Sequence, residues 1–554
     1  MLAFALAAAS LVPTAAGAAA AKAVKIGTPG PAAPGVGINT KAALAGPNCD
    51  AETKTLAIMF LTRVPCVTPW PEGKNNGGAT APGVTRTSIK VIAYAQSDDQ
   101  VRAGPASGQP INRATGGPGD QSQGIADALE IYQHAWENYG RTADLEIVNA
   151  SGTDEAAQRA DAVSVADKKP FFVIDTIGAP VFASAVAGSR IVVQSGSGTA
   201  EDAQKQAPYR WLGASDPNGP PVNAGEFVKK NLLGKPAQYG GDDVQTKTRK
   251  FGVLYPDTNL DIDLFLDQLP KKSYTAASYN VPLDTGQVTS ALQTQAATLI
   301  PRMKSENVTT IVLFGSTNVA TPMAAAAASQ NYTPEWFLPG TLGVDVSLTA
   351  RSIDQSQWAH AFGIGQLFPP IVGGTLNQNT AYYDWYWGPD QGTYCGACLS
   401  YWSTFARGVM FAGPNLSAKT FQQGMFSIPA TGGAATGNTQ NYLSAWGPNA
   451  GLPYDEYAGL GYDFYMYWYD PTNVGVSNIR ATSGTGRYAY LNSAQRFASG
   501  IWEKGDPKFF DKSASIYEMT ESATPGAGQA TLPQVDRLPT FTCTGCPSAG
   551  ATAR

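Results

Sequence analysis

Two glycine- and hydroxyl-rich turns carry the residue types best suited to binding a small molecule. The first, residues 177–180 (IGAP), follows the apolar run 171–175, and the second, residues 195–199 (SGSGT), follows the apolar run 191–194. Apolar runs of this length, separated by a small-residue helix over residues 181–187, predict a βαβ unit in a parallel sheet. Ligands of open α/β sheets lie beyond the carboxyl ends of the strands, so we expect a ligand at these two turns.

The two turns suit a polar acceptor group on that ligand. Small residues let a ligand approach the backbone N–H groups, and a helix N-terminus adds a partial positive charge that favours a carboxylate or another acceptor. A plain tight turn is the alternative interpretation for each. It is weaker for residues 195–199, where glycine and hydroxyl residues occupy every position.

Residues that could catalyse a reaction are sparse. The chain has two histidines, His134 and His360, for which we expect solvated or structural roles. The sequence contains no G-x-S-x-G elbow, H-E-x-x-H motif, Walker loop or G-x-G-x-x-G at a strand end. The pair Asp98 and Asp99 is expected to be solvated, because adjacent side chains on an extended segment diverge. We therefore expect no catalysis, no cofactor and no metal.

Length and composition favour an exported protein of several units. A chain of 554 residues is too long for one core, and its 15% of charged residues with 59 Gly and 39 Pro suit a secreted protein. The net charge of −5 does not provide the excess of basic residues that is typical of proteins that bind nucleic acid. Residues 1–22 look like a secretory signal peptide without a basic n-region, and no later run reaches the roughly 18 apolar residues of a membrane span. We expect an extracytoplasmic protein that is peripheral to the membrane at most.

Six cysteines fit that location, because disulfides form in exported proteins. Two alternatives remain open, namely a zinc site from the two C-x-x-C pairs and a thioredoxin-like redox role for residues 395–398. The two pairs are much further apart than in a zinc ribbon, and a redox motif should open a helix straight after a strand. We expect local disulfides, which pair Cys49 with Cys66, Cys395 with Cys398, and Cys543 with Cys546.

Strand and helix patterns alternate along two successive stretches. This predicts an α/β fold of two Rossmann-like lobes with a ligand cleft between them. Aromatic runs such as residues 462–469 (YDFYMYWY) are expected to pack in cores or lobe edges, with a minority lining the cleft. The expected divisions are a signal-like segment (1–22), an N-terminal arm that wraps the first lobe (23–87), lobe one (88–220), lobe two (221–345), an aromatic-rich extension that returns between the lobes (346–512) and a flexible tail (513–554).

With this order of segments, the chain resembles the type I periplasmic binding proteins. Within that class it is similar to the substrate-binding components of branched-chain amino acid ABC transporters. The segments that carry the likeness are GVTRTSIKVIAY, FFVIDTIGAPVFASAVA, IVVQSGSGT, FGVLYPD and TTIVLFGS. Further stretches look like a longer actinobacterial-style branch of these proteins, namely NCD, CVTPW, GTGRYAYLNSAQRF and WEKGDPKFFD. The resemblance covers residues 45–512.

The resemblance implies where a ligand would bind. Its carboxylate would meet the two turns of lobe one, and its ammonium an acidic residue after the strand at residues 309–314. This chain has no carboxylate over residues 315–320. An uncharged polar or aromatic molecule, an amide, or a carboxylate without an amine therefore fits at least as well as a plain branched-chain amino acid. The implied site residues are Gly178, Ala179, Ser195, Ser197 and Thr199 in lobe one, and Asp257, Ser316, Thr317 and Asn318 in lobe two.

These observations predict a solute-binding protein, not an enzyme. It would capture a small polar or amino-acid-like ligand between its lobes and deliver it to the membrane permease of an ABC transporter. The alternative is an extracytoplasmic sensor or partner-binding protein of the same fold without a transport role. An exported hydrolase would need an acid/base pair that the sequence does not contain.

Overall fold

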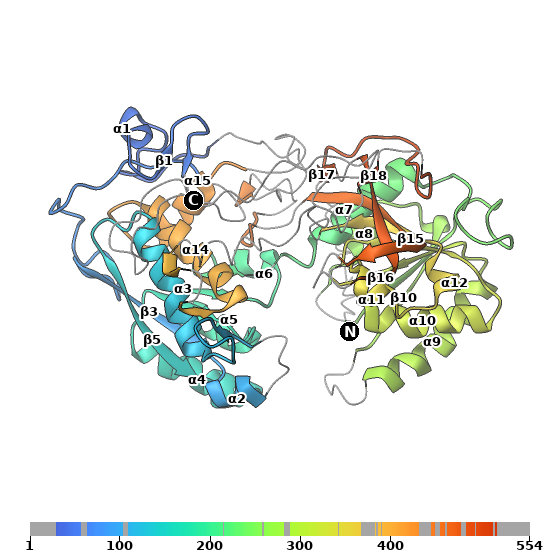
Figure 1. The fold of residues 1–554 in the computed structure, drawn as a ribbon, viewed down its shortest axis with the longest axis horizontal. Helices are drawn as coiled ribbons and strands as arrows, with labels where there is room; N and C mark the ends of the chain where they lie inside the picture. Colours follow the sequence, from blue (N-terminus) through green and yellow to red (C-terminus); the bar gives the residue numbers. More distant parts are fainter. Residues whose placement is uncertain are drawn as a thin grey trace, which may run out of the picture.

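The fold consists of two α/β lobes that lie side by side (Figure 1). Residues 1–22 and the cysteines Cys543 and Cys546 fall outside the residues that can be described, so the predicted signal peptide and third disulfide stay predictions. The computed structural model describes residues 29–56, 64–103, 109–213, 215–257, 260–281, 288–341, 343–366, 383, 386–388, 391–430, 445–448, 455–459, 463–477, 483–492, 495–512 and 516–517.

Lobe one is built on a five-stranded sheet in which every neighbouring pair is parallel. Its strand order is β5-β3-β6-β7-β8, so the direction of winding reverses between β3 and β6. In such sheets ligands bind outside the carboxyl ends of the strands. The strands are β3 (Ser88–Ala95), β5 (Thr142–Asn149), β6 (Phe172–Asp175), β7 (Val192–Ser195) and β8 (Arg210–Leu212).

Helices cover both faces of this sheet, as its nearly continuous apolar strands require. On one face α4 and α5 contact each other, and Tyr94 stacks on Phe182 with ring centroids 3.8 Å apart. On the other face α14 packs against α3, α15 and β6. The helices of this lobe are α2 (Asp98–Ala103), α3 (Gln121–Ala135), α4 (Glu155–Asp167), α5 (Pro180–Gly188), α6 (Ala200–Lys205), α14 (Gly396–Ala412) and α15 (Ala418–Ser427).

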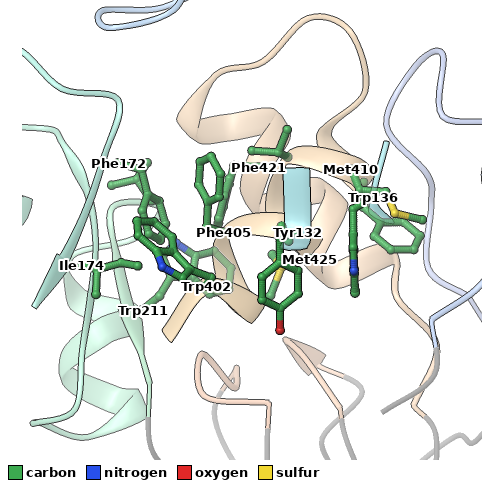
Figure 2. Close-up of a cluster of buried hydrophobic side chains, with 14 of the residues drawn as sticks. Tyr132, Trp136, Phe172, Ile174, Trp211, Trp402, Phe405, Met410, Phe421 and Met425 are labelled. Carbon is green, nitrogen blue, oxygen red and sulfur yellow. The ribbon is translucent and has the colours of Figure 1, made fainter. Parts of the chain in front are cut away.

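Aromatic residues from the C-terminal part of the chain complete the core of lobe one (Figure 2). Trp402 and Phe405 of α14 face Phe172 of β6, and the indole N–H of Trp402 donates to the Ile125 carbonyl at 2.8 Å. The ring of Trp211 lies 5.5 Å from that of Phe421. These contacts confirm the packing role that the sequence predicted for most aromatic residues.

The N-terminal arm lies against lobe one. Trp70 donates its backbone N–H to Glu137 at 2.9 Å, and the hydroxyl of Thr80 donates to the Leu416 carbonyl at 2.6 Å. The disulfides Cys49–Cys66 and Cys395–Cys398 are both formed, which confirms these two pairings. The arm holds α1 (Lys41–Leu44), β1 (Cys49–Asp50) and β2 (Thr55–Leu56), and β4 (Ile111–Asn112) pairs with β14 (Thr393–Tyr394) beside the second disulfide.

Lobe two repeats the same order of parallel strands, β10-β9-β11-β12-β13, and then continues with antiparallel strands. The tandem repetition that the sequence predicted is therefore confirmed. The strands are β9 (Phe251–Pro256), β10 (Tyr274–Tyr279), β11 (Thr310–Leu313), β12 (Glu335–Pro339), β13 (Ala361–Gly365), β15 (Asp463–Val476), β16 (Ser483–Leu491), β17 (Arg496–Ala498) and β18 (Ile516–Tyr517). The helices are α7 (Gly219–Asn231), α8 (Asp263–Leu266), α9 (Val288–Ser305), α10 (Thr317–Ser329), α11 (Ser347–Ala350) and α12 (Gln355–Trp358), with a 3₁₀ turn at Lys271–Ser273.

Three boundaries differ from the predicted ones. The sheet of lobe two extends past residue 345, because β13 and the long β15 and β16 pair return to it. Lobe two begins with helix α7 at Gly219 instead of residue 221, since proline is well placed in a first helical turn where no N–H donor is needed. Residues 516–517 form β18 on β16, within the stretch predicted as a flexible tail.

Candidate ligand site between the lobes

A cavity of about 480 Å³ lies where the carboxyl ends of the two sheets face each other. Its walls come from the loops after β7 and β8 in lobe one and from the ends of β9, β11, β12 and β13 in lobe two. Strand ends of both sheets therefore meet at one place, as the doubly wound topology predicts. The lining residues are Gly196, Gly198, Ser215, Asp216, Pro217, Pro220, Pro256, Leu260, Phe314, Gly315, Ser316, Thr341 and Gln366.

The second predicted turn contributes its glycines to this cavity, while its hydroxyls bond within lobe one. Ser195 is fully buried and donates to Asp175 at 2.7 Å, and its hydroxyl lies 3.1 Å from that of Ser197. The Thr199 hydroxyl accepts the N–H of Asp202 at 3.1 Å and so caps α6. A cap of this kind contributes about 1 kcal/mol to helix stability. The turn is thus held rigid by its own side chains.

The first predicted turn already holds a carboxylate, that of Asp175. One oxygen of Asp175 accepts the N–H groups of Ile177 and Gly178, both at 3.0 Å. The other accepts the Ala179 N–H at 2.6 Å and the Ser195 hydroxyl. Burial raises the pKa of Asp175, and these four hydrogen bonds oppose that rise. The N–H groups of Gly178 and Ala179, expected to meet a ligand carboxylate, are therefore occupied in this structure.

The predicted residues of lobe two point to different places. Ser316 lines the cavity at the start of α10. The Thr317 hydroxyl donates to the Gly343 carbonyl at 3.0 Å, and Asn318 lines a separate groove between α9 and α10. Asp257 is exposed next to the cavity residue Pro256, and its N–H donates to the Tyr279 carbonyl at 2.7 Å. Of the lobe-two residues predicted from the sequence, Ser316 is thus the one placed in the cavity wall.

Several lining residues were not predicted as site residues, and Asp216 is the most informative of them. It lies in the loop that follows β8, where the sequence reads SDPNGPP and resembles a linker. Only 1% of Asp216 is exposed, and one carboxylate oxygen accepts the N–H groups of Ala200 at 3.3 Å and Asn218 at 3.2 Å. Its position after a parallel strand is the signal that could have identified it.

Comparisons with known proteins give matches among solved structures. No protein-family model matches the chain, and no curated protein does. A leucine-, isoleucine-, valine-, threonine- and alanine-binding protein from Brucella ovis, in a closed conformation, is 9% identical with a TM-score of 0.47, covering 76% of this chain and 98% of that one.

Two other alignments have similar extent. A solute-binding protein of an ABC transporter from Rhodopseudomonas palustris BisB5, in complex with 3,4-dihydroxybenzoic acid, is 11% identical with a TM-score of 0.43, covering 74% of this chain and 98% of that one. An ABC transporter substrate-binding protein from Aeropyrum pernix is 10% identical with a TM-score of 0.42, covering 75% and 97%. Among the described residues of the present chain, no helix is both long and apolar enough to cross a bilayer.

Proposed function

We propose that the protein is an extracytoplasmic solute receptor. It would close its two lobes over a small molecule and deliver that molecule to the permease of an ABC transporter. The observation that carries this proposal is the cavity of about 480 Å³, whose walls come from strand ends of both lobes. Pockets for small molecules typically have volumes of this order and lie between domains.

The mechanism follows from the division of the walls between two bodies. A ligand in the cavity gains its full set of contacts only when Gly196 and Asp216 of one lobe approach Leu260 and Ser316 of the other. It therefore binds the closed arrangement more tightly and shifts the open and closed populations toward closure. A permease that recognises the closed arrangement would respond only to the loaded receptor.

A thermal-shift screen of the purified protein tests the binding step. The compounds are amino acids, amides, aromatic acids, amines, sugars and short peptides. A ligand at 100 times its Kd adds about 2.7 kcal/mol to the free energy of unfolding, which gives a clear rise in melting temperature. If the folded protein showed no rise with any compound, the proposal of a solute receptor would be wrong.

A matched pair of glycine variants locates the site once a ligand is known. A Cβ atom added at Gly196 meets no atom within 4 Å, so Gly196→Leu would fill the cavity without displacing protein atoms. Gly188 is equally unobstructed but lies at the end of α5, away from the cavity. We expect Gly196→Leu to weaken binding at least about tenfold, or about 1.4 kcal/mol, and Gly188→Leu to leave it unchanged in calorimetric titrations. Equal affinities in the two variants would place the ligand elsewhere.

A further inference from the structure

The wall of the interlobe cavity combines apolar and neutral polar residues with one charged side chain. Among the described residues that line it, Asp216 is the one with a formal charge. The side chains of Pro217, Pro220 and Leu260 form apolar parts of the wall. A second negative charge brought next to a buried carboxylate is strongly unfavourable, whereas a positive charge there is favoured.

The carboxylate of Asp216 is fixed before any ligand binds. One of its oxygens accepts two backbone N–H groups, from the first residue of α6 and from the residue before α7. The Asn218 side chain in turn accepts the N–H of Asp261 at 3.0 Å, which ties this loop to lobe two. A charge held in this way is already oriented for a ligand, so little ordering entropy is lost on binding.

Two further carboxylates, Asp261 and Glu201, are not among the lining residues but interact with each other. Asp261 follows the lining residue Leu260, and its pKa is raised by burial and by the neighbouring charges of Asp263 and Glu201. Glu201 belongs to α6 of lobe one, where it pairs with Lys205 at 3.1 Å, and its like charge also acts on Asp261 of lobe two. A cationic ligand would reduce this repulsion as the lobes close.

The basic residue behind the cavity, Arg210, bonds within lobe one. Arg210 lies behind Gly198, where it donates to the Ser197 carbonyl at 3.3 Å and to Gln206 at 3.1 Å. Burial lowers the pKa of Arg210, while Asp202 and Asp175 act in the opposite direction. The Asp175 carboxylate also occupies the N–H groups of the first turn. A ligand carboxylate would therefore have to displace Asp175 to reach those N–H groups.

We propose that the cavity takes a small organic cation, an amine with an apolar body and no carboxylate. The ammonium group would lie against Asp216, and the apolar body against Leu260 and the neighbouring prolines. This inference rests on the proposed function of a solute receptor and specifies the class of its ligand.

Matched sets of compounds test this ligand class. Each set has one carbon skeleton with an amine, an alcohol or a carboxylate, for example benzylamine, benzyl alcohol and benzoate, or isopentylamine, isopentanol and isovalerate. Affinities are measured by calorimetry at pH 7 and low salt. We expect the amine to bind about tenfold or more tighter than the alcohol of the same set, because a charge-assisted hydrogen bond is stronger than a neutral one. The carboxylate should bind more weakly than the alcohol.

Two variants connect that preference to Asp216. Asp216→Asn keeps the oxygen that accepts the Ala200 and Asn218 N–H groups but removes the charge, so the fold should be retained. In this variant the amine should bind less than about threefold more tightly than the alcohol. The affinity for the alcohol itself should change by less than about threefold. Glu155→Gln removes a charge from the exposed start of α4, away from the cavity, and should leave the preference unchanged.

The outcomes separate this inference from the proposed function. If a carboxylate bound as tightly as its amine, or if Asp216→Asn kept the preference for amines, the ligand class would be wrong while the solute receptor remained. If neither the matched sets nor the broader thermal-shift screen gave any binding, both proposals would be wrong. Tighter binding of amines that is lost in Asp216→Asn supports both.

Discussion

At the scale of single residues, Asp175 and Asp216 differ in their position relative to the interlobe cavity. Both are buried carboxylates that follow or neighbour strand ends of lobe one, and both accept backbone N–H groups. Asp175 accepts the backbone N–H groups of the first turn, whereas Asp216 lies in the cavity wall. Their hydrogen bonds are similar, but their positions relative to the cavity give them different consequences for a ligand.

We expect Asp175→Ala to destabilise lobe one by about 3 kcal/mol, because it leaves three backbone N–H groups and the Ser195 hydroxyl without their acceptor. Asp175→Asn retains one acceptor oxygen and should lose less. Urea unfolding measures the difference.

The matched control is Asp154→Ala at the start of α4. Asp154 also accepts two backbone N–H groups, at 3.0 Å each, but it is exposed to solvent, so we expect a loss of about 1 kcal/mol. If the two alanine variants lost the same amount, burial would not be what makes the Asp175 bonds important.

The sequence indicated where both turns lie but not that Asp175 occupies the N–H groups of the first. Residues 177–180 and 195–199 do follow buried strands, as their glycines and small residues predicted. Whether the N–H groups of the first turn are available to a ligand depends on the orientation of the Asp175 side chain. Residue types alone do not specify that orientation. Asp216 was missed for a related reason, because the SDPNGPP stretch resembles a linker until β8 is seen to end just before it.

At the scale of elements, one buried ion pair fixes the starts of two neighbouring strands in lobe two. Glu335 begins β12 and accepts two hydrogen bonds from Arg249, both at 2.7 Å. It also accepts the hydroxyl of Thr310, which begins β11, at 2.6 Å, and the Tyr239 N–H at 3.1 Å. The side chains of Glu335 and Arg249 are 0% and 1% exposed, so neither charge is stabilised by water.

We expect Glu335→Gln to lower the free energy of unfolding of lobe two by about 3–5 kcal/mol, because Arg249 would be left as an uncompensated buried charge. Calorimetry or urea unfolding would measure this. The exposed pair of Glu155 with Arg159 is the control, and Glu155→Gln should cost less than about 1 kcal/mol. A loss of similar size in both variants would mean that burial adds nothing to the Glu335 pair.

The alternating strand and helix pattern predicted most elements of the two parallel sheets, but not the strands that extend the second one. Residues 464–469 are mostly aromatic, a composition common to strands and to packed helices, so their pattern did not distinguish the two. Their assignment to β15 depends on pairing with β13 and β16, and β13 is distant in the sequence. Long-range pairing of this kind cannot be read from a local window.

At the scale of the whole molecule, the two lobes share one strand order and face each other with their carboxyl ends. The order of segments predicted this duplication. It did not predict where each lobe ends, because the chain passes back to lobe one at α14 and α15 and again to lobe two at β15 (Figure 1). The chain therefore crosses between the lobes more than once.

The like charges of Glu201 and Asp261 across the cleft should oppose closure in the free protein. We therefore expect Glu201→Gln combined with Asp261→Asn to shift the ligand-free molecule toward the closed arrangement, which small-angle X-ray scattering detects as a smaller radius of gyration. Salt should act in the same direction on the unaltered protein, because the screening length falls from about 8 Å at 0.15 M to about 3 Å at 1 M. The double variant should not respond to salt in this way.

The control for the charge pair is Glu155→Gln combined with Asp167→Asn, which removes the same number of charges from the two ends of α4 in lobe one. Its radius of gyration and its response to salt should match those of the unaltered protein. If the control and the cleft variant behaved alike, net charge would govern the shape of the molecule. If neither differed from the unaltered protein, repulsion between Glu201 and Asp261 would have no part in holding the cleft open, and a cationic ligand would have to act through Asp216 alone.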